Sequence, residues 1–280
     1  MAGRQRISPG LRRLRRSPSA WIGGSLVLLM VLVAAFAPLI ADRSPDQQNL
    51  RTRLRPPSAE QPFGTDEFGR SMLARTVYGA RISLLTGLIP VVVALSIGAL
   101  IGLLAGFSGG RIDALLMRLM DVLLAFPSLL LALAVVGTLG PGLINAVIAI
   151  SIVGIPEYAR IVRSVVLSSK EEEYVQAAGA LGAGNWRVML RHVLPNAVGP
   201  VVVQATLGIG FAIMAIAGLS FLGLGVQPPV SDWGEMLARG RRYLPGATWL
   251  MLFPGAAVSL TVLGFNLLGD AVRDALDPRA

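Results

Sequence analysis

The stretch ISLLTGLIPVVVALSIGALIGLLAGF, residues 82–107, is the part of the sequence that decides the fold. It contains no charged side chain. It is also longer than the run of about 20 apolar residues that a helix needs to cross the hydrocarbon core of a bilayer, which is roughly 30 Å thick. We therefore predict a membrane-spanning helix here.

Similar apolar blocks recur on both sides of this stretch. The chain of 280 residues is 54% hydrophobic and 15% charged, and its mean hydropathy is +0.65. In a typical soluble domain about a quarter of the residues are charged. The pattern predicts an all-α, polytopic membrane protein with six transmembrane helices, near residues 21–41, 82–107, 115–137, 143–155, 197–219 and 249–268.

The N-terminus sets the predicted topology. Residues 1–20 are rich in arginine and contain no acidic residue, so the positive-inside rule places them in the cytoplasm. A cleaved signal peptide is the competing interpretation, because Ala35-Phe36-Ala37 imitates a cleavage site. The apolar run is longer than the core of a typical signal peptide, which favours a retained span.

Six spans then divide the chain into segments. We expect an arginine-rich cytoplasmic N-terminus at 1–20, a first helix at 21–41, an extracytoplasmic segment at 42–81, a five-helix core at 82–270 and a cytoplasmic tail at 271–280. The core would hold a cytoplasmic segment at 168–196 and an extracytoplasmic loop at 221–248. Arginine greatly outnumbers lysine, which suggests a GC-rich genome, so the expected location is a bacterial cytoplasmic membrane with both termini inside.

The net charge and the absence of cysteine exclude several kinds of function. The net charge of +9 is typical of cytoplasmic flanks and contact with anionic lipid. Nucleic-acid binding would need a basic face on a folded soluble module, and the sequence contains none, so it is not expected. The absence of cysteine excludes disulfides and thiolate metal sites. No cofactor or metal site is expected.

The cytoplasmic segment SSKEEEYVQAAGALGAGNWRVMLRHVLPN, residues 168–196, predicts two short amphipathic helices. Ser169 and Glu172 have the spacing of a capping box, and Gly182 and Asn185 can end one helix and cap the next. Leu194-Pro195 would stop the second helix. The apolar positions follow helical spacing and are Tyr174, Ala177, Ala178 and Leu181, then Trp186, Met189, Leu190 and Val193. Such helices could dock in a groove of a partner protein or lie on the membrane surface, and spacing alone leaves both open.

The same segment resembles the EAA motif of ABC importer permeases. The matching residues are Gln176, Ala177, Ala178, Gly182, His192, Leu194 and Pro195, with Gln176 where that family usually has glutamate. The resemblance implies a coupling helix that sits in a cleft of an ATPase subunit, with Tyr174 on the same face. His192 is the only histidine, so it cannot build a metal site unaided.

Other segments resemble dipeptide and oligopeptide permeases of the DppC/OppC type. They are FGTDEFGRSMLARTVYGARISL at 63–84, GLSFLGLGVQPPVSDWGEML at 218–237 and LGFNLLGDAVRDALDPR at 263–279. The resemblance implies a type I ABC importer permease-like core for di- or oligopeptides or similar small solutes. It also implies a homologous permease as heterodimer partner, two ATP-binding subunits or domains, and an extracytoplasmic solute-binding protein.

Two of these segments predict short helices on the outer surface. Thr65 or Asp66 could cap a helix that carries Phe68, Met72 and Leu73. Asp232 and Glu235 form a second capping box, before Trp233, Met236 and Leu237. These helices could seal the bundle, dock a solute-binding protein or gate the outer mouth.

Small and polar residues mark features within the predicted spans. Gly98, Gly102, Gly106 and Gly110 recur every fourth residue, which indicates close helix packing, and Pro127 predicts a kink. Arg118 and Asp121 could pair on one helix face near the cytoplasmic start of the third span. The candidates for pathway or structural polar residues are Arg118, Asp121, Gln204, Asn266 and Asp270.

Other function classes fit the sequence less well. A P-loop needs Gly-Lys followed by Ser or Thr, but the only lysine, Lys170, lies between Ser169 and Glu171. ATP hydrolysis would therefore have to come from partner chains, and no enzymatic activity is expected. A secondary transporter or channel acting without ATPases remains the alternative, although no convincing internal repeat supports it.

Overall fold

A computed structural model describes residues 13–15, 17–181, 184–189, 191 and 194–276. The described chain is helical and contains no strand, which confirms the all-α prediction. The long helices are α2 (Pro18–Ala35), α4 (Met72–Ser108), α7 (Leu143–Lys170), α10 (Leu194–Phe221) and α12 (Trp249–Leu276). The shorter elements are α3 (Ala37–Ile40), α5 (Gly110–Leu124), α6 (Ser128–Leu139), α8 (Glu173–Ala180), α9 (Asn185–Val188), α11 (Trp233–Gly240) and the 3₁₀ turns η1 (Leu50–Thr52) and η3 (Arg241–Tyr243).

Five of the described helices are long and apolar enough to cross a membrane, and α5 with α6 makes a sixth if that bent pair is one span. The two members of the pair meet at 90°, so the expected single kinked helix at 115–137 is instead broken in two. The break lies at Pro127, where the backbone is extended and no helical N–H is available. The proline also disfavours helical geometry at Phe126.

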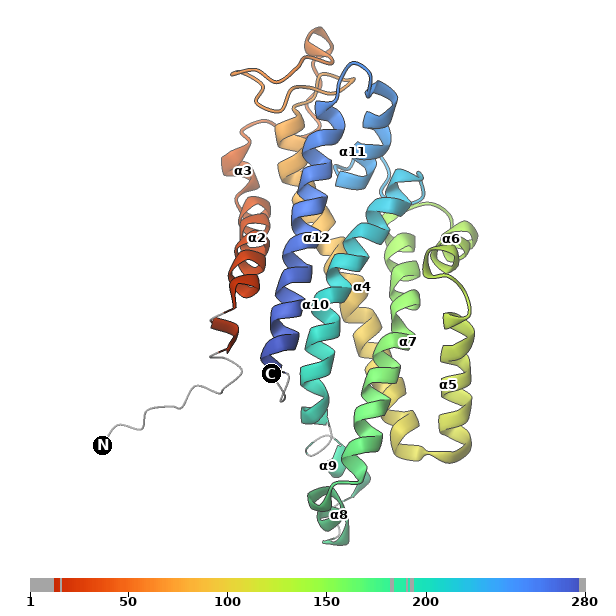
Figure 1. Ribbon diagram of the computed structural model, residues 1–280. Coiled ribbons are helices and arrows are strands. Elements are labelled where there is room, and N and C mark those ends of the chain that lie inside the picture. The colour runs from red at the N-terminus through yellow and green to blue at the C-terminus, as the bar shows by residue number, and fades with distance from the viewer. Residues whose placement is uncertain (1–12, 16, 182–183, 190, 192–193, 277–280) are drawn as a thin grey trace, which may run out of the picture.

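The bundle has two distinct ends in Figure 1. The short helices α8 and α9 lie at one end, and α11 with the loop before α4 lies at the other. We call these the α8 end and the α11 end. Helix α2 begins, and α12 finishes, toward the α8 end (Figure 1).

Glycines bring α4 and α7 into direct backbone contact. A Cβ at Gly98 would lie 2.6 Å from the Ile155 carbonyl oxygen, and one at Gly102 would lie 2.4 Å from that of Ala159. A Cβ at Gly106 would lie 2.8 Å from the side chain of Val166 and 3.2 Å from the Arg163 carbonyl oxygen. Gly110 has open space around it and a positive φ at the start of α5, so it does not belong to the stripe.

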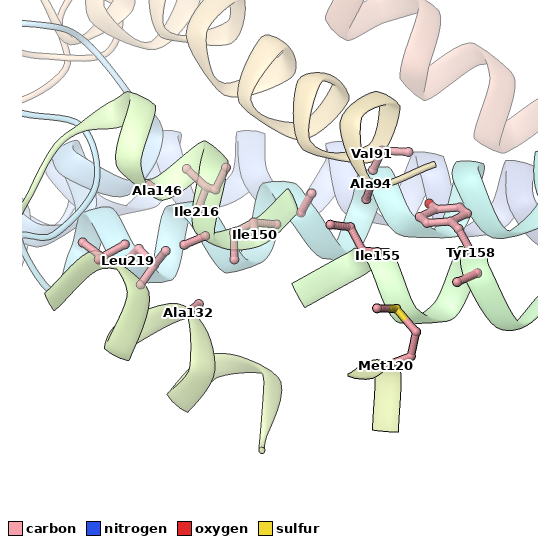
Figure 2. Close-up of a cluster of buried hydrophobic side chains, with 14 residues drawn as sticks. Val91, Ala94, Met120, Ala132, Ala146, Ile150, Ile155, Tyr158, Ile216 and Leu219 are labelled. Carbon is pink, nitrogen blue, oxygen red and sulfur yellow. The ribbon is translucent and has the colours of Figure 1, made fainter. Parts of the chain in front are cut away.

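The main apolar core forms around this α4–α7 contact. Figure 2 shows Val91 and Ala94 of α4 beside Ile155 and Tyr158 of α7, while Met120 reaches them from α5. At the other side of the bundle, α2 packs on α12, where a Cβ at Gly23 would clash with the backbone of Leu268 and Gly264. The first helix is thus attached mainly through α12, with a smaller contact to α4, and stands apart from α7 (Figure 1).

The α11 end differs in detail from the predicted caps. Asp232 does cap α11, accepting from the N–H groups of Gly234 and Glu235, but the Glu235 side chain turns to arginines and does not close the box. The described residues around Phe68 form a turn and not the expected helix. The Asp66 carboxylate stabilises this turn by accepting hydrogen bonds from the N–H groups of Phe68 and Arg70. Helix α4 starts only at Met72, capped by Ser71.

Candidate coupling segment and membrane cavity

Helices α8 and α9 are fixed to the end of the bundle by apolar contacts. Val175 of α8 and Val188 and Met189 at α9 are buried against Leu103 of α4 and Val166 of α7. The predicted capping box is wrong, because α7 continues through Ser169 to Lys170 and α8 begins only at Glu173. Leu194-Pro195 opens α10 and does not stop a preceding helix, since proline is tolerated in the first helical turn.

The predicted docking face of α8 points away from the bundle where the structure describes it. Tyr174 is 47% exposed, Leu181 is 89% exposed, and Gln176 and Ala177 are exposed as well. The Tyr174 hydroxyl accepts a hydrogen bond of 2.7 Å from the Asn196 amide of α10. Gly182 and His192, and the side chain of Ala178, lie outside the described residues.

Lys170 ties the α7–α8 junction to α4, and sequence reasoning missed this role. Its ammonium donates to the carbonyl oxygens of Gly106 at 2.8 Å and Phe107 at 2.6 Å. It also lies 4.5 Å from the centre of the Phe107 ring. These carbonyls belong to the last turn of α4, where backbone acceptors lack helical partners and attract a cation. The contact was not predictable, because the two sites lie far apart in sequence.

A cavity of about 290 Å³ opens among α4, α5, α6, α7 and α10. Most of its wall is apolar, and its polar side chains are Ser128, Glu157, Tyr158 and Gln204. The Gln204 amide donates to the Glu157 carboxylate at 2.6 Å, which joins α10 to α7. Of the predicted polar candidates, Gln204 lines this cavity. Glu157 is not among the predicted polar candidates, because the fourth span was expected to end at residue 155, whereas α7 continues through Pro156.

The remaining polar candidates lie elsewhere. Asp121 pairs with Arg160 of α7 at 2.5 Å, so the expected partner, Arg118, is wrong. Asn266 and Asp270 are exposed positions on α12, and Asn266 lies against Gly210 of α10. None of these four residues lines the cavity.

A buried charge network holds the α11 end together. Arg75 of α4 binds Glu235 of α11 at 3.1 Å, and Asp66 binds Arg70 at 2.6 Å. Arg239 contacts Glu235 and Glu67. Burial raises the pKa of the Glu235 carboxyl, although Arg75 and Arg239 act in the opposite direction. Trp233, 1% exposed, donates from its indole to the Thr76 carbonyl oxygen and completes the seal against α4.

Comparison with known proteins identifies the family. Residues 98–280 match the binding-protein-dependent transport system inner membrane component. The chain belongs to this family of ABC importer permeases. Residues 8–57 match the N-terminal transmembrane domain of oligopeptide transport permease C.

Several permeases are similar over nearly the full length of the chain. The dipeptide transport system permease protein DppC of Alkalihalophilus pseudofirmus is 49% identical over 98% of this chain and 91% of its own. The di/tripeptide transport system permease protein DppC of Pseudomonas aeruginosa is 51% identical over 92% and 88%. The glutathione transport system permease protein GsiD of Pectobacterium atrosepticum is 43% identical over 96% and 89%. This permease is therefore a multi-pass membrane subunit of an importer, and the relatives it resembles are named as permease proteins.

Proposed function

We propose that this chain forms one half of the translocation pathway of an ABC importer for di- or oligopeptides. The observation that carries the proposal is the identity of about half the residues, across nearly the whole chain, with permeases named for dipeptides and di/tripeptides. A homologous permease would supply the other half of the pathway. A solute-binding protein would deliver cargo at the α11 end.

In this proposal, α8 and α9 are the contact with one of the two ATP-binding subunits, and the homologous permease would contact the other. Tyr174, Gln176, Ala177, Ala178 and Gly182 would contribute the docking face, and His192, Leu194 and Pro195 would shape the return to the bundle. The exposure of Tyr174, Ala177 and Leu181 supports this role. Apolar side chains gathered on a surface outside the membrane generally mark a site where a partner protein binds. ATP hydrolysis would occur on the partner chains.

Movement of α8 would reach the spans through two contacts. Lys170 joins the start of this segment to the last carbonyls of α4, and Val175 packs among residues of α4 and α7. Because closely packed elements shift as units, displacement of α8 would bias the bundle between two arrangements. The chain contributes no covalent chemistry.

The proposed orientation places the α8 end in the cytoplasm. The start of α2 and the finish of α12 lie toward that same end (Figure 1), and the arginine-rich N-terminus favours the cytoplasm. The location would be a bacterial cytoplasmic membrane. The network around Arg75 and Glu235 would then face the binding protein's side.

The docking role is tested by placing charge on the exposed face of α8. We expect Ala177→Arg combined with Leu181→Glu to abolish co-purification of the ATPase subunits, because both positions are exposed and remote from the spans. The matched control is Leu50→Glu in η1, an exposed leucine at the opposite end, 64% accessible, which should leave association unchanged. Unaltered association in the double variant would overturn the docking assignment.

A further inference from the structure

The cavity described above contains one charged side chain among the described residues that line it, Glu157. No ion pair to Glu157 occurs within the described part of the chain, where its contact is the hydrogen bond from Gln204. A carboxylate has about four acceptor sites, so this bond leaves most of its acceptor capacity available. Glu157 is also exposed, because the cavity is open on the side that this chain does not cover.

The length of α7 puts Glu157 in the apolar layer when the hydrocarbon core begins near the start of this helix. It lies fourteen residues after Leu143, the first residue of α7, a distance of about 21 Å at 1.5 Å per residue. The hydrocarbon core is about 30 Å thick. Ionisable groups at such depth are costly and generally face a water-filled cavity or bind a partner.

A purely structural role would not require this carboxylate. A hydrogen bond between α7 and α10 needs one acceptor opposite Gln204, which a neutral amide also supplies, although the bond is weaker than one to a carboxylate. The negative charge adds an attraction for cations and nothing to that bond's geometry. The neighbouring wall, including Val91, Leu207 and Phe211, is apolar and suits the uncharged part of an amphipathic solute.

We propose that Glu157, oriented by Gln204, receives the ammonium group of the cargo during passage, namely the free α-amine of a short peptide. This inference rests on the proposed peptide transport and adds the part of the cargo that this chain recognises. The cavity of about 290 Å³ is just below the usual volume of ligand sites, roughly 300–1,000 Å³. It would therefore take one end of the peptide, and the partner permease would close the opposite wall.

Protection from chemical labelling tests the ammonium contact directly. A carbodiimide is applied, without any added amine, to the assembled permease–ATPase complex in mildly acidic buffer and without binding protein. The loss of unmodified Glu157 is followed by mass spectrometry, and every adduct is counted, including the amide formed with a dipeptide's own amine. We expect alanyl-alanine to slow labelling several-fold and N-acetyl-alanyl-alanine to leave it unchanged. Equal protection by the two peptides, no protection, or failure of Glu157 to react would each overturn the inference.

Uptake by variant transporters gives the second readout. In proteoliposomes with binding protein and ATPases, Glu157→Gln should lower alanyl-alanine uptake per ATP hydrolysed by about tenfold, the scale of a lost charge-assisted hydrogen bond. Glu157→Asp should recover most of it, and Glu60→Gln, an exposed glutamate in the loop before α4, should match wild type. Full uptake by Glu157→Gln would overturn the inference alone, whereas a wild-type complex that imports no peptide would overturn the proposed function.

Discussion

Asp232 is the most completely enclosed carboxyl group at the α11 end. It accepts hydrogen bonds from the Ser83 hydroxyl and from the backbone N–H groups of Gly234 and Glu235. Burial raises its pKa above the ordinary value of 3.8, and these hydrogen bonds only partly offset that effect. Asp232 therefore caps α11, but its burial disfavours the charged form of the carboxyl group.

Two replacements of Asp232 separate the contribution of the helix cap to stability from the contribution of the charge. Asp232→Ala should lower the free energy of unfolding by about 1–2 kcal/mol, the usual cost of a lost N-cap, while Asp232→Asn should cost much less because asparagine caps equally well. Thermal unfolding of the purified permease in detergent measures both. Equal losses in the two variants would show that the cap geometry is not what Asp232 contributes.

The raised pKa of Asp232 predicts how the stability difference between wild type and Asp232→Asn changes with pH. Between pH 3.8 and the raised pKa, the folded protein keeps a proton on Asp232 that the unfolded chain has lost. The stability of wild type should therefore fall, relative to Asp232→Asn, as pH rises through this window. A stability difference that stays constant with pH would contradict the raised pKa.

Single residues show where sequence reasoning succeeds and where it stops. The Asp232 cap was predictable because it depends on neighbours two and three residues away. The long-range partners of Glu235, Asp121 and Lys170 were not predictable, because Arg75, Arg160 and the α4 carbonyls are distant from them in sequence. Local periodicity carries no information on contacts between residues that are far apart in sequence.

At the scale of elements, the α4–α7 pair depends on glycine at the contact. Gly102→Val would place a branched side chain where even a Cβ lies 2.4 Å from a backbone oxygen, so the helices must separate. We expect a loss of at least about 1–3 kcal/mol, the usual cost of overpacking. The control is Gly137→Val in α6, where a Cβ meets nothing within 4 Å.

The readout for this pair is the unfolding midpoint of each variant, together with the yield of folded protein in the membrane. Gly102→Val should lower both, and Gly137→Val should leave them close to wild type. Similar behaviour of the two variants would mean that the close approach of α4 and α7 does not govern the stability of the bundle.

The existence of the elements was easier to predict than their ends. Long apolar runs specify spans because the bilayer demands them, and all six predicted runs correspond to helices, with the third broken at Pro127. The helices α4, α7 and α12 nevertheless continue beyond the apolar stretches. Their extra turns are polar on one face and are stabilised by tertiary contacts such as Arg75–Glu235, which composition does not reveal.

At the scale of the whole molecule, the chain has the form of an incomplete pathway. The cavity beside Glu157 is open on one side, and α5, α6 and α7 expose large apolar side chains, including Leu115, Leu130 and Ile144. In a membrane such surfaces meet lipid or another helix bundle. The proposed second permease over the cavity, with lipid around the rest, would account for both features.

The measurement that tests the account most directly is peptide uptake into proteoliposomes that contain this permease and its partner permease, with and without the ATPase subunits. The account predicts ATP-dependent import of alanyl-alanine when the ATPases and binding protein are present, and no import when the ATPases are left out. Import by the two permeases alone would contradict it and would identify a secondary transporter instead.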